Sequence, residues 1–145
     1  MTKFKFRVWD KEEKHMHYMP AAELYEVLFL RADGVLCDVD ESAMHSNGYS
    51  KDPRPAYEKY EVSFSTGLKD CEGQEIWEGD VIGYIFEEKI LCKYHVEYRK
   101  CCFYGTALQG IYKDYMLYDL IHAMYPENKF KVIGNRFTNP ELLEQ

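Results

Sequence analysis

Two histidines near the start of the chain are spaced as metal ligands can be. His15 and His17 are separated by one residue, so on a β-strand both imidazoles would face the same side, and imidazole is a common ligand of transition metals. A transition-metal site takes three or four ligands, and no carboxylate is placed near this pair to complete one. We therefore expect an exposed pair on a hairpin and no bound metal.

A cluster of acidic residues follows in the middle of the chain. Residues 70–80 hold five carboxylates in eleven positions, and paired carboxylates can act as general acid and base or bind a divalent cation. The spacing is not that of an EF-hand, which requires a D-x-D-x-D-G framework and a final Glu. We expect a hairpin turn and a bulged strand with the carboxylates in water. Asp80, between Gly79 and Val81, is the exception, since it could accept hydrogen bonds from backbone N–H groups of a tight turn.

Adjacent cysteines are the remaining candidate nucleophiles. Cys101 and Cys102 would point to opposite faces of a strand, and a catalytic cysteine served by His95 or His122 is an alternative without a geometric argument. The chain holds no glycine-rich phosphate loop, no G-x-S-x-G elbow and no H-E-x-x-H motif. We therefore expect no catalytic residues, no cofactor and no enzymatic activity.

Charge is divided unevenly along the second half of the chain. Residues 60–88 carry eight acids and one base, whereas residues 89–113 carry five bases and one acid. If these segments are adjacent strands, opposite charges pair across the sheet, each exposed pair contributing less than about 1 kcal/mol. The alternative is a two-faced surface that meets a second copy of the chain or an acidic partner. Tyrosines interleave the basic segment, and they suit protein interfaces and also stack on bases. The candidate binding residues are Lys93, Tyr94, Tyr98, Arg99, Lys100 and Tyr104.

The composition limits these functions. The 145 residues include 18 Lys and Arg against 25 Asp and Glu, a net charge of −7, and 46% are hydrophobic. One ordinary domain is the natural count, and the apolar content excludes intrinsic disorder. The negative charge disfavours nucleic acid without excluding it, because phosphates require Lys and Arg. The sequence shows neither a signal peptide nor a run that could span a membrane, and its five cysteines are irregularly spaced. We therefore expect a cytoplasmic protein with reduced thiols.

Alternating apolar and polar residues predict a mainly β fold that positions these side chains. The strands expected from this period of two cover residues 4–9, 15–19, 25–30, 35–39, 60–65, 76–86, 90–98, 101–108 and 130–133. Residues 67–73 are rich in turn formers. Asp114 is expected to cap a helix over residues 115–124 that buries Met116, Leu120, Ala123 and Met124.

The stretch at residues 41–58 differs from the rest of the chain. It is rich in Ser, Pro, Asn and Gly and almost free of aliphatic residues, which predicts a long flexible loop. It follows an N-terminal β-rich segment, residues 1–40. Residues 59–145 are expected to form a small SH3-like barrel or β-roll with a short helix. The two parts either stand apart or form one compact unit.

Three stretches together carry a family resemblance. The first is K-F-R-V-W-D at residues 5–10, followed by Lys14 and Met16; the second, at residues 66–82, contains the pattern T-G-L-x-D-x-x-G-x-x-I-x-x-G-D; the third is V-I-G-N-R-F-T-N-P-E-L-L at residues 132–143. In this order they resemble the YopX family, small proteins of phages and prophages of low-GC Gram-positive bacteria. The motif positions interpreted as structural are Trp9, Gly67, Gly73, Trp77, Gly79, Asp80, Gly134, Asn135 and Pro140.

The resemblance implies a fold and a setting but no activity. It implies an SH3-type β-barrel with extra elements, encoded by a phage and working in the cytoplasm of the bacterial host. We expect a non-enzymatic accessory protein that binds an unidentified phage or host protein or assembles as a homo-oligomer. The alternative is a nucleic-acid-binding barrel that uses the basic residues 89–113 and their tyrosines.

Overall fold

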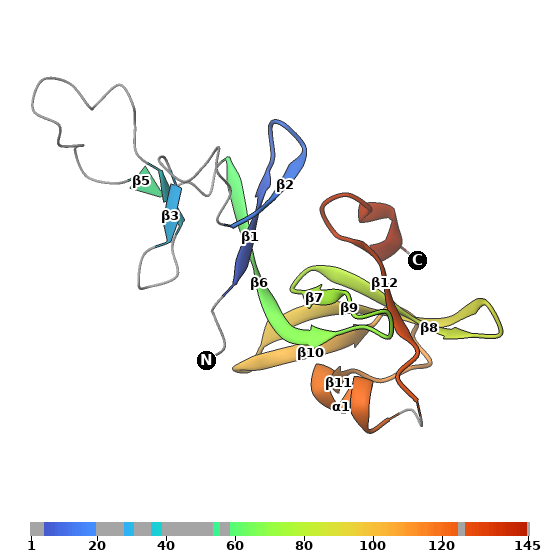
Figure 1. The fold of residues 1–145 in the computed structure, drawn as a ribbon. Helices are drawn as coiled ribbons and strands as arrows, with labels where there is room; N and C mark the ends of the chain where they lie inside the picture. Colours follow the sequence, from blue (N-terminus) through green and yellow to red (C-terminus); the bar gives the residue numbers. More distant parts are fainter. Residues whose placement is uncertain are drawn as a thin grey trace, which may run out of the picture. The chain divides into compact units, whose positions relative to one another are not determined.

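The computed structural model divides the chain into two compact units, residues 1–63 and residues 64–145. The described residues are 5–19, 28–30, 36–38, 54–55, 59–124 and 127–144, with the backbone alone described in the three short strands at 28–30, 36–38 and 54–55. The boundary between the units falls inside strand β6, Tyr60–Lys69 (Figure 1).

The first unit begins with the hairpin that the sequence predicts. β1, Phe6–Asp10, pairs antiparallel with β2, His15–Tyr18. Val8 is fully buried. The Asp10 carboxylate closes the turn, because its Oδ1 accepts hydrogen bonds from the backbone N–H groups of Glu12 and Glu13, both at 2.9 Å. β1 lies between β2 and β6 in its sheet.

Three short strands form a separate sheet in this unit. β3, Leu28–Leu30, pairs antiparallel with β4, Leu36–Asp38, which agrees with the strands expected at residues 25–30 and 35–39. β4 also pairs with β5, Arg54–Pro55. β5 lies inside the range predicted as a loop, and the other residues of 41–58 lie outside the described residues.

The second unit is built on a curled antiparallel sheet in the order β11-β10-β9-β8-β12, which forms an open half-barrel (Figure 1). Its strands are β8, Asp80–Phe86; β9, Lys89–Arg99; β10, Cys102–Ala107; β11, Tyr115–Met116; and β12, Phe130–Asn135. β7, Glu75–Trp77, pairs with β6. One helix, α1, Leu117–His122, and a 3-10 turn, Pro140–Leu143, complete the unit. The prediction of a mainly β fold with a short helix is confirmed.

The core of the second unit lies between the curled sheet and α1. Phe130 is fully buried, and the rings of Tyr84 and Tyr94 meet it edge-on with centroids 5.3 and 5.9 Å away. Leu120 of α1 packs into the same cluster. It reaches β10 because Gly105 has no side chain; a Cβ there would lie 2.5 Å from Leu120 Cδ2. The helix therefore docks where the sheet leaves room for it.

The helix starts later than the sequence predicts. Residues 115–116 form β11, and α1 begins at Leu117 without a side-chain cap. The predicted cap, Asp114, instead accepts hydrogen bonds from Ala107 N–H and from the Arg99 guanidinium. The buried helix residues are Leu117, Leu120 and Ile121, and Met116 and Met124 are exposed. The predicted apolar stripe is thus wrong except at Leu120, because pairing with β10 holds residues 115–116 extended.

The predicted turn region at residues 67–73 is shorter in the structure. β6 continues to Lys69, with an irregularity in its pairing to β7 between Ser65 and Lys69. Gly67 adopts a φ of +76° there. The glycine therefore bends β6 at this point, and the strand continues beyond it.

Candidate functional site

β9 divides the predicted binding residues between its two faces. Tyr94 at an even position is buried in the core, whereas the odd positions Lys93 to Arg99 share the opposite face. Tyr104 of β10 lies on the face of Arg99, whose Cζ is 4.5 Å from the Tyr104 ring centroid. The structure thus brings Lys93, Arg99 and Tyr104 onto one side of the sheet.

The other two predicted residues lie elsewhere. Tyr98 is on the side of Tyr94, exposed near the end of β9, and meets the Phe103 ring edge-on at 5.2 Å. Lys100 occupies the turn between β9 and β10 with a φ of +51°. The tyrosines and bases of this segment therefore do not form one continuous surface.

A polar cavity of about 340 Å³ lies against the odd-numbered face of β9. Its walls include His95, Glu97 and Arg99 from β9, Glu78 from the turn before β8, and Arg136 from the segment after β12. Residues far apart in sequence meet here because β9 lies next to β8, which pairs on its other side with β12.

A chain of hydrogen bonds orients the imidazole in this cavity. His95 Nδ1 lies 3.1 Å from Glu97 Oε1, and Thr106 Oγ1 donates to Glu97 Oε2 at 2.7 Å. Both carboxylate oxygens of Glu97 are thus engaged. Arg99 Nη2 donates to Asp114 Oδ2 at 2.8 Å. Two nitrogen atoms of these side chains, His95 Nε2 and Arg99 Nε, are buried and have no hydrogen-bond partner among the described residues.

Burial sets the protonation of His95. Desolvation lowers the pKa of the imidazole below its usual value of 6.5; Glu97 opposes this shift and the Arg136 charge adds to it. At neutral pH the ring is therefore uncharged. With Nδ1–H donated to Glu97, its Nε2 carries a lone pair and acts as an acceptor.

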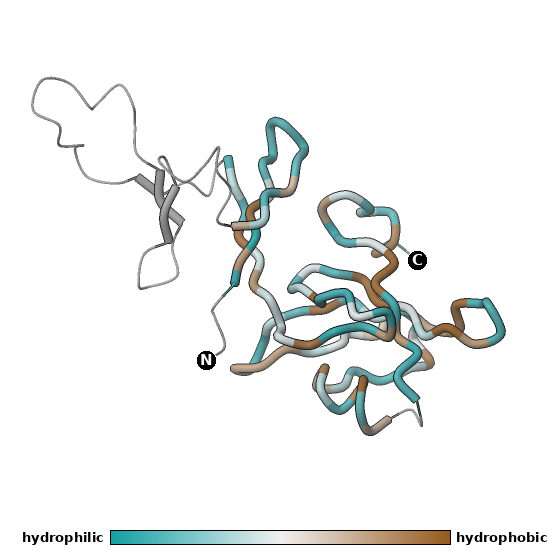
Figure 2. The backbone as a smooth tube through the Cα atoms, viewed as in Figure 1, coloured by the Kyte–Doolittle hydropathy of each residue, from teal (hydrophilic) through white to brown (hydrophobic). Residues whose placement is uncertain are grey.

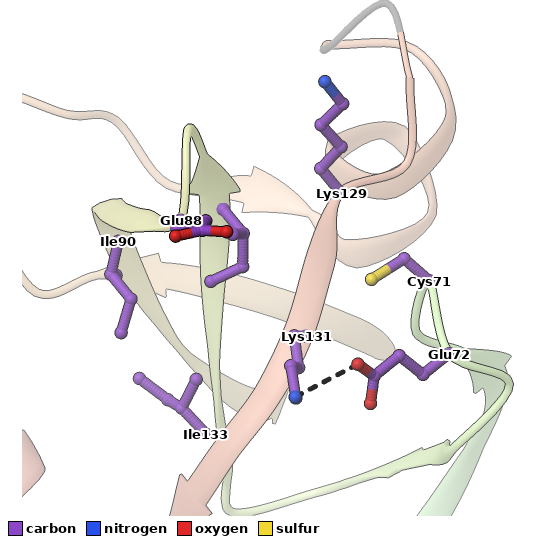
Figure 3. A pocket seen from close by; sticks show the side chains of 8 residues that line it. Cys71, Glu72, Glu88, Ile90, Lys129, Lys131 and Ile133 are labelled. Carbon is purple, nitrogen blue, oxygen red and sulfur yellow. Dashed lines mark ion pairs between the residues drawn. The ribbon is translucent and has the colours of Figure 1, made fainter.

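A second concave surface lies at the hairpin of β8 and β9. Ile85, Ile90 and Ile133 line a groove of about 530 Å³, and Ile90 and Ile133 point into the same space (Figure 3). Gly83 makes this possible, since a Cβ at that position would lie 3.1 Å from Ile90. Figure 2 shows apolar residues running along both strands of the hairpin to a polar tip. Ile90 and Leu91 are each 48% exposed.

Most of the charges at this groove are paired within the chain. Lys131 Nζ lies 3.1 Å from Glu72 Oε1 (Figure 3), and Lys129 Nζ lies 3.3 Å from Glu127 Oε2. Glu88, in the hairpin turn, has no ion-pair partner among the described residues. The groove therefore combines an apolar floor with one free carboxylate at its rim.

The predicted histidine pair lies on β2. The rings of His15 and His17 contact each other edge-on, with centroids 4.7 Å apart. Within the described residues no group of three or more His, Cys, Asp or Glu side chains could hold a metal ion. The same residues contain no helix long and apolar enough to cross a membrane.

Comparison with known proteins places the chain in a family. The family model described as YopX protein matches residues 5–144. The chain belongs to the YopX family. Protein EF1440 from Enterococcus faecalis has a similar structure, with 25% identity and a TM-score of 0.54 over 99% of this chain and 100% of that one. Protein yopX from Bacillus subtilis is 19% identical with a TM-score of 0.53 over 97% and 98% of the two chains. The search of curated proteins found no match.

In this YopX-family chain the long middle motif builds turns. Asp70 Oδ1 accepts hydrogen bonds from the backbone N–H groups of Glu72 and Gln74, both at 2.9 Å, and its Oδ2 accepts one from Val132 at 3.0 Å. Asp80 Oδ2 accepts from Trp77 N–H at 2.8 Å. These carboxylates thus satisfy backbone donors of the turns.

The remaining motif positions pack or cap as well. Trp9 and Trp77 are buried. Gly134 is crowded, since a Cβ there would lie 2.6 Å from Asn139 Oδ1. Asn135 Oδ1 accepts from the N–H groups of Phe137 and Thr138 at 3.0 and 2.9 Å, and Pro140 begins the 3-10 turn. These motif positions make turns and packing contacts, and other motif residues line the two concave surfaces: Glu78 and Arg136 in the cavity, Glu72 and Ile133 in the groove.

Sequence reasoning missed the His95 cavity although part of the signal was visible. The alternation of β9 places His95, Glu97 and Arg99 on one face. The contributions of Thr106 and Arg136 depend on strand pairing that no local pattern encodes.

Proposed function

We propose that this protein is a phage- or prophage-encoded accessory protein that acts by self-assembly rather than by catalysis. The hairpin groove supports this, because contiguous exposed apolar surface with a polar rim is typical of protein interfaces. The lining of the groove defines the chemistry of its partner. An apolar side chain would contact Ile90 and Ile133, and a neighbouring cation would pair with Glu88.

The chain itself presents such a group. Ile111 is 86% exposed, the most exposed of the large apolar residues described, and Lys113 follows it two positions later. We infer that Ile111 of one copy enters the groove of the next, with Lys113 near Glu88. The two surfaces differ, so the contact is head-to-tail and builds a ring or a chain rather than a twofold dimer.

Mixing variants tests this arrangement. Sedimentation velocity should show assembly of the wild type and monomers of both Ile90→Asp, which spoils the groove, and Ile111→Asp, which spoils the inserted side chain. An equal mixture of the two should form dimers and stop there, since only one productive contact is possible between them. Tyr118→Asp, at a 61% exposed site on α1, is the matched control and should assemble normally.

Two results would contradict self-assembly through this contact. One is a wild type that stays monomeric at high concentration; the other is a mixture that assembles no better than its components. A third outcome is a monomeric wild type that captures a protein from host lysate, while the Ile90→Asp variant does not capture it. The groove would then bind a different protein and not a second copy of this chain.

Nucleic-acid binding is the second candidate. Its support is the stacking of Arg99 on Tyr104 with Lys93 on the same face, since Arg and aromatic rings hold single strands. The ion pair of Arg99 with Asp114 and the net charge of −7 weigh against it. A gel-shift assay with single-stranded DNA and RNA at low salt tests it, and no shift removes this candidate.

A further inference from the structure

His95 and Arg99 both line one cavity, and their buried atoms Nε2 and Nε have no protein partner among the described residues. Buried polar groups are satisfied in nearly all native structures, by protein, by water or by a ligand. Two such atoms on the same face of one strand, at positions 95 and 99, point to a group supplied from outside the chain. Arg99 Nε–H is always a donor, so that group must offer an acceptor.

The charges of the cavity oppose an anion until His95 is protonated. The guanidinium groups of Arg99 and Arg136 balance the carboxylates of Glu78 and Glu97 among the lining residues. Asp114, which is paired with Arg99, adds one further negative charge, so the sum is −1 while His95 is neutral, and Nε2 is then an acceptor. A proton adds one positive charge and turns Nε2 into a donor, and Glu97 is already placed at Nδ1 to stabilise the imidazolium.

The remaining groups near His95 add no further charge to this sum. Thr106 on β10 and Val81 on β8 lie opposite it and carry no charge. Tyr98, whose ring lies on the other side of β9 against Phe103, also borders the cavity. Asp114 binds Arg99 through Nη2 and so leaves Nε available.

We propose that this cavity binds an oxyanion, the phosphate or carboxylate group of a ligand, together with one proton taken from solvent by His95. Arg99 Nε–H and His95 Nε2–H donate to the oxygens of the anion. Glu97 accepts from His95 Nδ1–H throughout. This site is separate from the hairpin groove and does not depend on self-assembly.

NMR titration of the histidine C2–H signals of the full chain tests the proposal. Sodium sulfate is the probe for a phosphate group and sodium acetate for a carboxylate, each compared with sodium chloride at equal ionic strength. The bound anion should raise the pKa of His95 and leave that of the exposed His122 unchanged. By linkage, a rise of about one unit corresponds to roughly tenfold tighter binding at low pH than at high pH. The probe that gives the larger rise identifies the class of ligand.

Variants separate this site from general charge effects. His95→Gln can still donate to Glu97 but cannot take up the proton, so amide shifts of β9 should report weak binding that no longer depends on pH. Arg99→Gln should weaken binding at every pH, and His122→Gln should behave as the wild type. The proposal is overturned if both anions leave the His95 pKa at its chloride value, or if His95→Gln keeps the pH dependence.

Discussion

Gly79 and Gly73 allow backbone strain to be separated from crowding. Both have a left-handed backbone, with φ of +89° and +83°. An added Cβ at Gly73 would meet nothing within 4 Å, whereas at Gly79 it would lie 2.9 Å from Arg136 Nε and 3.1 Å from Phe137 Cε2. Gly73→Ala should therefore lower the unfolding free energy only by the cost of holding a non-glycine residue at positive φ, about 1–2 kcal/mol.

Alanine at Gly79 should cost more. Forcing a methyl group into a filled space adds about 1–3 kcal/mol, so Gly79→Ala should lose about 2–5 kcal/mol in all. Urea unfolding followed by circular dichroism measures both variants, and the midpoint should fall further for Gly79→Ala. Gly67→Ala, with a φ of +76° and no atom within 4 Å of the added Cβ, is a second reference and should match Gly73→Ala. If Gly79→Ala is no less stable than these two variants, crowding by Arg136 and Phe137 is not the reason why position 79 requires glycine.

Three further outcomes follow from contacts in the second unit. Asp70→Ala leaves three backbone N–H groups without their acceptor, including that of Val132; it should lose about 2–4 kcal/mol in urea unfolding, and an unchanged midpoint would contradict the role of this carboxylate. Glu87 and Glu88 form a two-residue turn with φ of +47° and +64°, so replacement by Asn-Gly should stabilise the protein by about 1 kcal/mol, and a lower melting temperature would count against strain there. Because the folded pKa of His95 lies below its unfolded value, its contribution to stability is complete above pH 6.5 and is lost as pH falls through the folded pKa; His95→Gln should flatten the fall in thermal stability over this range.

Strands were predictable from the sequence where one face is buried. Residues 90–98 alternate cleanly, and β9 buries Cys92, Tyr94 and Val96 as the period of two requires. The same reasoning located β1, β8 and β12. It failed at residues 115–124, because apolar spacing alone cannot show that two residues pair with β10 before the helix begins.

Ion pairing was less predictable than strand order. The acidic segment 60–88 and the basic segment 89–113 do meet as the neighbouring strands β8 and β9. Yet Arg99 of the basic segment pairs with Asp114, and Glu72 of the acidic segment pairs with Lys131; both partners lie outside the two segments. Which side chains form ion pairs depends on strand register and side-chain length in the folded sheet, and not on blocks of like charge along the sequence.

β12 is synthesised after β8, β9 and β10, yet it supplies Phe130 to the centre of the core and a neighbour for β8. Until it leaves the ribosome, β8 is an open edge with Ile82 and Tyr84 uncovered. Such edges and apolar surfaces are where nascent chains aggregate or engage chaperones. The yield of this protein in a cell should therefore depend on how quickly the chain between β8 and β12 is translated, and not only on the stability of the finished fold.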